Sequence, residues 1–77
     1  EADALSRERA RLLYEALERL SPILRETFLL RAVEDLPAED VARITKSTTG
    51  AVHTRVSRAR DAIRAYVEGR DGKEGGS

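Results

Sequence analysis

The sequence predicts an all-α domain of four helices, and three observations support that fold class. Apolar residues recur at three- and four-residue steps in separate stretches, which is the spacing of one face of a helix. Between these stretches lie residues typical of helix starts and stops, such as Ser21-Pro22 and Asp35-Leu36-Pro37. The 77 residues include no cysteine, so helix packing must stabilise the small core without disulfides.

The first two helices are expected over residues 3–20 and 22–33. Ser21 supplies a side-chain acceptor at the N-cap of the second helix, and Pro22 has the fixed φ of a first helical position. Two aromatic residues of this part, Tyr14 and Phe28, lie at helical positions suited to core packing. The apolar stripes comprise Leu5, Leu12, Leu13, Ala16, Leu17 and Leu20 on the first helix, and Ile23, Leu24, Thr27, Phe28 and Leu30 on the second.

Two more helices are expected over residues 38–44 and 49–67, separated by a polar turn over 45–49 in which Thr48 is placed to cap the last helix. The stretch 69–77 lacks apolar residues and is interpreted as a helix stop and a disordered polar tail, which leaves residues 1–68 as the domain. The inward positions are Val41, Ala42 and Ile44 on the short helix, and Val52, Val56, Ala59, Ile63 and Tyr66 on the long one.

Charge is balanced overall but unevenly distributed. The 14 basic and 14 acidic residues cancel, yet residues 1–42 carry six arginines against ten acidic residues. Residues 43–60 carry five basic residues and no acidic one. A local cluster of this kind is typical of a surface that binds a phosphate backbone, although a solvated helical face is the simpler alternative.

The last two expected helices and their tight turn form a helix-turn-helix, in which the second helix lies in the DNA major groove. Burying Val52 turns the opposite side of that helix outward, because successive residues are rotated by about 100°. Small residues and hydroxyl groups there allow close approach to bases, and cations reach phosphates. The candidate DNA contacts are Lys46, Thr48, Thr49, Ala51, His53, Thr54, Arg55, Ser57 and Arg58.

Two of these candidates have a competing structural interpretation. Arg55 lies close to the buried seam, where an arginine can instead form an ion pair with acidic residues of the first helices. Arg58 lies on the outward side, where a pair with Asp61 is the alternative.

Three segments between residues 16 and 65, LSPILRETFLLR, DLPAEDVARI and GAVHTRVSRARDAIR, resemble region 4 of extracytoplasmic-function sigma factors. The most specific part is the run Ser57-Arg58-Ala59-Arg60. The resemblance implies recognition of a −35 promoter element in duplex DNA, contact with the flap region of the RNA polymerase core, sequestration by an anti-sigma factor, and a cytoplasmic protein. The −35 sequence, the controlling signal and the anti-sigma partner do not follow from it.

The sequence departs from that family's pattern at four positions. Lys46 stands where the family usually has Gly, Ser47 replaces an apolar residue, Ala51 replaces Thr, and His53 replaces Lys. A left-handed backbone at Lys46 costs of order 1 kcal/mol relative to Gly, so a looser or differently shaped turn is expected. The preferred DNA sequence therefore cannot be taken from relatives.

Other function classes find little support in the residues. His53 is the sole histidine and lacks further metal ligands, and Glu39-Asp40 is typical of a first helical turn rather than of acid–base catalysis. We expect no enzyme activity, cofactor, metal or membrane span, and a chain cut from a longer protein. Two alternatives remain: a sigma-like interaction module that binds an anti-sigma factor, and the DNA-binding output domain of a response regulator, which usually dimerises.

Overall fold

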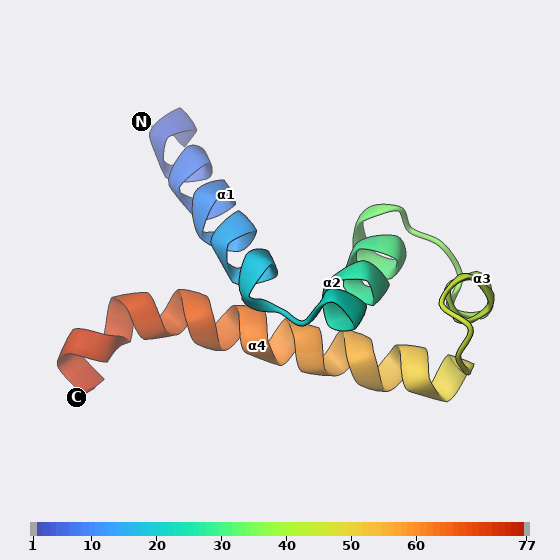
Figure 1. Cartoon of the computed structure of the whole chain (residues 1–77). Coiled ribbons are helices and arrows are strands. Elements are labelled where there is room, and N and C mark those ends of the chain that lie inside the picture. The colour runs from blue at the N-terminus through green and yellow to red at the C-terminus, as the bar shows by residue number, and fades with distance from the viewer. Residues whose placement is uncertain (1, 77) are drawn as a thin grey trace.

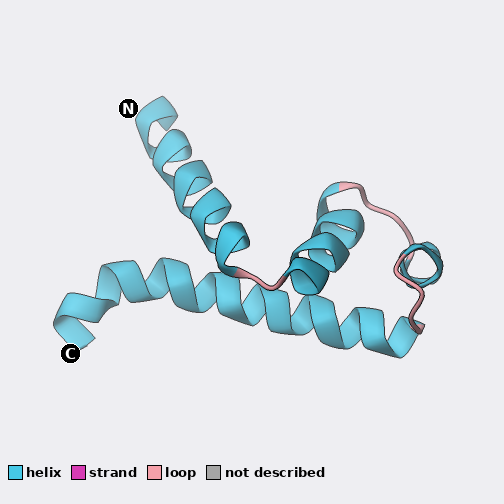
Figure 2. Ribbon diagram, in the orientation of Figure 1, coloured by secondary structure: helices cyan, strands magenta, loops and turns pink. Residues whose placement is uncertain are grey.

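The computed structural model describes residues 2–76, with side chains from residue 3 to residue 69, and this part of the chain consists of helices joined by short loops (Figure 1 and Figure 2). The all-α prediction is confirmed, and the boundaries expected for the third helix match the observed ones. The elements are α1 (Ala2–Arg19), α2 (Pro22–Phe28), the π-helical turn η1 (Leu29–Val33), α3 (Ala38–Ile44) and α4 (Thr49–Gly76).

The second helix changes its hydrogen-bond pattern half-way. Ser21 caps α2 as expected, accepting a hydrogen bond from Leu24 N at 3.4 Å. From Leu29 onward the turn widens, and Glu34 N donates to Leu29 O at 2.9 Å, five residues back. The helix predicted over residues 22–33 is thus confirmed, but its second half is π-helical rather than α-helical. A π turn rotates the chain less per residue than an α turn, and Leu29, which the apolar pattern left outside the stripe, packs into the core.

Two hydrophobic clusters hold the helices together along α4. One cluster joins α3 to the first turns of α4, and the other joins the end of α1 to the middle of α4. Phe28 of α2 packs against both clusters, so it links them. Complete burial of a valine contributes roughly 1.5–3 kcal/mol, and Val41 and Val52 are both fully buried. The buried members are Val41, Ala42, Val52 and Val56 in the first cluster, and Leu17, Leu20 and Ala59 in the second.

Several residues expected to face the core are exposed instead. The N-terminal half of α1 diverges from α4, as Figure 1 shows, so nothing covers its part of the stripe. The radius of gyration is 14.1 Å, larger than the roughly 11.5 Å typical of a compact domain of this length. The exposed fractions are 60% for Leu5, 40% for Leu13, 67% for Tyr14, 38% for Ile23 and 51% for Ile44.

The last helix is longer than predicted. It continues to Gly76, so the helix stop expected at Gly69 is wrong. A glycine in a helix costs only about 1 kcal/mol, and no proline follows Val52 to end the helix. The side chains beyond Gly69 lie outside the described residues, and the division into a domain and a tail stays a prediction. Over the described residues, no helix combines the length and hydropathy that crossing a membrane would require.

Candidate nucleic-acid interface

The turn between α3 and α4 is a complete Schellman motif. Lys46 N donates to Arg43 O at 3.3 Å, and Ser47 N donates to Ala42 O at 2.8 Å, which is the paired pattern that defines this helix ending. Lys46 occupies its left-handed position with φ 56°. The predicted left-handed conformation of Lys46 is thus confirmed. Both defining bonds are formed, and a turn looser or differently shaped than in relatives stays a prediction.

Hydroxyl groups form further hydrogen bonds in this turn. Thr45 Oγ1 donates to Val41 O at 2.8 Å and lies 2.8 Å from Ser47 Oγ. Ser47 therefore takes part in a polar network where the family usually places an apolar side chain. Thr48 caps α4 as predicted, accepting a hydrogen bond from Ala51 N at 3.0 Å. Because both ends of the turn are fixed, the first residues of α4 begin at a defined angle to α3.

The burial of α4 determines which side of its first turns meets the solvent. Val52 and Val56 are buried beneath α3 and α2, which turns the opposite side of the helix outward. The sequence predicted this orientation. Among the candidate contacts, those with exposed side chains are Lys46, Thr48, Thr49, His53, Thr54, Ser57 and Arg58.

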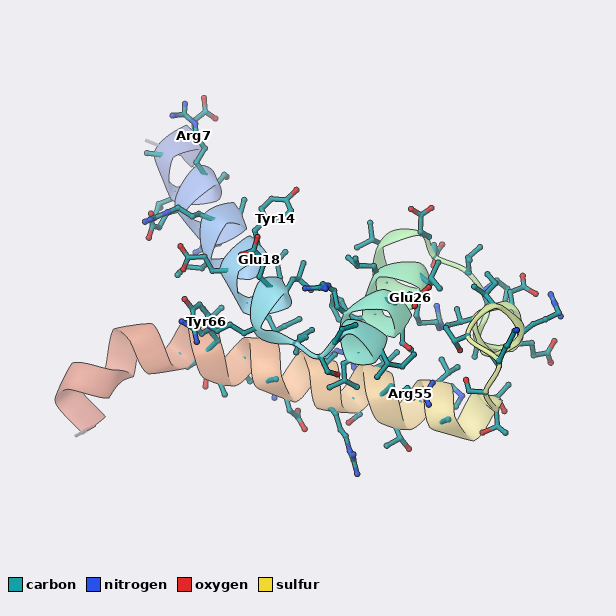
Figure 3. The ribbon with its side chains drawn as sticks, in the orientation of Figure 1. Arg7, Tyr14, Glu18, Glu26, Arg55 and Tyr66 are labelled. Carbon is teal, nitrogen blue, oxygen red and sulfur yellow. The ribbon has the colours of Figure 1, made fainter. Side chains whose placement is uncertain are left out.

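Two candidates differ from this exposed group. Ala51 is half-buried at the edge of the face, where it can limit the approach of a partner without donating a hydrogen bond. Arg55 is also half-buried and lies on the side of α4 toward α2 and α3 (Figure 3). Its Nη1 atom is buried and has no hydrogen-bond partner among the described residues. Neither the ion pair considered for Arg55 nor that considered for Arg58 occurs among the described side chains.

Beside this face, a pocket of about 470 Å³ lies between η1 and α4. Groups that can donate hydrogen bonds make up most of its polar lining, namely an imidazole, a hydroxyl group and two guanidinium groups. Arg31 was missed as a functional candidate because it precedes the helix-turn-helix by several residues in sequence. The sequence alone carried no signal for it, because the π turn that holds Arg31 is a feature of the folded chain. The lining residues are Arg31, Ala32, Asp35, His53, Val56, Ser57 and Arg60.

One acidic residue near the turn is paired with a basic residue of the same helix. Asp40 in the first turn of α3 forms an ion pair with Arg43, three residues later, and both side chains remain partly exposed. Asp40 thus offsets one basic charge of the cluster at residues 43–60. In the portion with described side chains, no group of three His, Cys, Asp or Glu residues is arranged to hold a metal ion. The site offers a polar and cationic surface.

Comparison with known proteins assigns this arrangement to a family. The family described as Sigma-70, region 4 matches residues 10–63, which span all of α2, η1 and α3 and the first turns of α4. The chain belongs to the sigma-70 region 4 family. The "ECF RNA polymerase sigma-E factor" of Haemophilus influenzae is 32% identical over 68 residues, which are 88% of this chain and 36% of that protein.

The resemblance to region 4 of extracytoplasmic-function sigma factors is confirmed by these matches. In this sigma region 4 domain, α3 and α4 form the helix-turn-helix, while α1, α2 and η1 pack behind them. The chain spans about a third of the relative's length, since it covers 36% of that protein. The matched region ends at residue 63, before the helical extension of α4.

Proposed function

We propose that this sigma region 4 domain recognises the −35 element of a bacterial promoter during transcription initiation. One observation carries the proposal: the outward side of the first turns of α4 presents hydroxyl, imidazole and guanidinium groups on a rigidly capped helix. Such a helix fits the major groove, where its donors and acceptors meet base edges. The reading residues are Thr48, Thr49, Ala51, His53 and Thr54.

Charge supports a phosphate backbone as the partner at the rim of this face. Residues 43–60 contain no acidic residue, and Lys46, Ser57 and Arg58 are exposed around the turn and the outward side of α4. Contacts of this kind position a protein on duplex DNA without reading its sequence. Arg55 is the weakest candidate, since most of its side chain lies within the protein. The role proposed here is non-catalytic.

Protein partners belong to the same proposal. The region 4 family and the RNA polymerase sigma-E relative support contact with the RNA polymerase core. We propose that this contact involves the flap of the core and that an anti-sigma factor sequesters the domain. The apolar residues that α1 exposes, Leu5, Leu13 and Tyr14, provide a surface for a protein partner. The same exposed residues favour the second candidate function, an interaction module that binds an anti-sigma factor and does not bind DNA.

A selection on randomised duplex DNA tests the proposal, with the 77-residue chain and with the longer parent protein. We expect a shared −35-like sequence from both selections and weak binding by the isolated chain. With about five basic contacts, its affinity should fall a few tens-fold between about 50 and 200 mM salt.

Two other results would replace the proposal. Absence of duplex binding at low salt, together with retained anti-sigma binding, favours the interaction module. Dimers on paired half-sites favour the response-regulator type of output domain.

A further inference from the structure

The pocket between η1 and α4 has a composition suited to an anion. Arg31 approaches from η1, while Arg60 and His53 approach from α4. The two guanidinium groups can each donate several hydrogen bonds, and Ser57 adds a hydroxyl donor at the same wall. Phosphate oxygens are the acceptors that forked guanidinium donors match best.

The position of the pocket connects it with the proposed DNA face. His53 and Ser57 belong both to the pocket lining and to the exposed side of α4. A helix seated in the major groove, which is about 12 Å wide, has sugar–phosphate backbone passing along its sides. The pocket therefore opens where a backbone phosphate passes when α4 is in the groove.

Asp35 contributes a negative charge to this otherwise cationic lining. Its Oδ1 lies 3.9 Å from Arg31 Nη1, at the limit of an ion pair. The carboxylate side chain is 93% exposed, and such a pair adds little to stability. Asp35 also has a left-handed backbone, with φ 62°, a conformation that is tolerated by aspartate but costly relative to glycine. The negative charge of Asp35 therefore contributes little to the stability of the fold.

We infer that the pocket between η1 and α4 binds a backbone phosphate of duplex DNA and that Asp35 competes with this phosphate for Arg31. The inference rests on the proposed function and adds a restraint on affinity that is built into the fold. When α4 enters the groove, Arg31 leaves the Asp35 carboxylate for the phosphate. The domain consequently binds duplex DNA less tightly than its basic residues alone would allow.

The test compares Asp35→Asn with the wild-type 77-residue chain. Asparagine keeps the shape of the side chain and tolerates a left-handed backbone, so the variant removes the charge without disturbing the turn. The probe is a fluorescently labelled duplex of mixed sequence, titrated over a salt series. We expect affinity to rise about 3- to 10-fold at low salt and the salt dependence to steepen by up to about 0.9 in log–log slope.

Glu34→Gln is the matched control. Glu34 is exposed, adjacent in sequence and outside the pocket lining, and its change alters net charge by the same amount. It should raise affinity less than about twofold, through long-range charge alone. In an Arg31→Ala background, Asp35→Asn should lose most of its effect on affinity. The side chain for which Asp35 and the phosphate compete is absent from that variant.

The outcomes separate the two ideas. A wild-type chain that binds no duplex at low salt overturns the proposed function itself. A wild-type chain that binds, with Asp35→Asn no tighter than Glu34→Gln, overturns the competition by Asp35 and leaves the proposed function in place. A gain from Asp35→Asn that persists in the Arg31→Ala background also overturns it.

Discussion

The hydroxyl of Tyr66 donates a hydrogen bond to Glu15 Oε1 at 2.8 Å and so joins α4 to α1 across 51 residues of sequence (Figure 3). The guanidinium of Arg19 lies over the same ring, 5.0 Å from its centroid. Below these polar contacts, Leu17 of α1 and Leu20, which follows the end of α1, pack against Ala59 of α4. The angle between the two helices is thus set by one aromatic side chain and a small apolar seam.

Replacing Tyr66 with Phe should lower the free energy of unfolding by about 0.5–1.5 kcal/mol, because the hydrogen bond to Glu15 is lost while the ring stays beneath Arg19. Urea unfolding followed by circular dichroism measures the change. Tyr14→Phe is the control, since the Tyr14 side chain is 67% exposed on the neighbouring helix. Equal effects from the two substitutions would contradict a specific role of the Tyr66 hydroxyl.

Thr27→Val should stabilise the domain by about 1 kcal/mol. Thr27 is fully buried in α2, and its Oγ1 has no hydrogen-bond partner among the described residues. A buried hydroxyl without a partner is costly, and valine has nearly the same shape. Thr27→Ser keeps the hydroxyl and removes a methyl group, so it should destabilise. Thermal unfolding of both variants decides the matter, and a less stable valine variant would show that the hydroxyl is satisfied in solution.

Lys46→Gly should raise the free energy of unfolding by about 0.5–1 kcal/mol, because glycine adopts the left-handed backbone of Lys46 without a penalty from Cβ. Lys46→Ala removes the same charge but keeps Cβ, and should not stabilise. Both variants should bind duplex DNA more weakly at low salt, since Lys46 is an exposed cation beside α4. A lower unfolding midpoint for the glycine variant would contradict the strain assigned to this turn.

Arg58→Ala should weaken binding evenly across sequences and reduce the salt slope by about one, as expected for a phosphate contact. If Arg58 instead reads a base, the substitution costs about 1–3 kcal/mol and relaxes preference at one promoter position. Affinities for the selected duplex and a scrambled one, each over a salt series, distinguish these results. Arg64→Ala, two turns further along α4, is the matched control. Wild-type affinity of Arg58→Ala for both duplexes would show that Arg58 does not face DNA.

Helix positions and the orientation of α4 could be predicted from the sequence because they depend on local signals. The spacing of Val52, Val56 and Ala59 defines one buried side whatever the rest of the chain does. Lys46 was predicted in a left-handed turn because the family resemblance placed it at a glycine position. Its observed φ of 56° agrees.

Features that depend on tertiary packing could not be predicted from the sequence. The apolar residues of Leu29–Val33 fit an α-helix equally well, so their spacing does not predict the π turn. Position 35 holds an aspartate rather than the glycine that usually marks a left-handed residue. Its φ of 62° could therefore not be predicted from the sequence. The exposure of Leu5 and Tyr14 follows from the angle between α1 and α4, which periodicity within one helix does not encode.

The continuity of α4 has a mechanical consequence. Its first turns carry the proposed reading face, and Tyr66 holds α1 some 14 residues later, about 21 Å along the axis at 1.5 Å per residue. No glycine or proline interrupts residues 51–68, so this length contains no hinge. A protein that binds α1 is therefore held at a fixed distance along α4 from the proposed reading face.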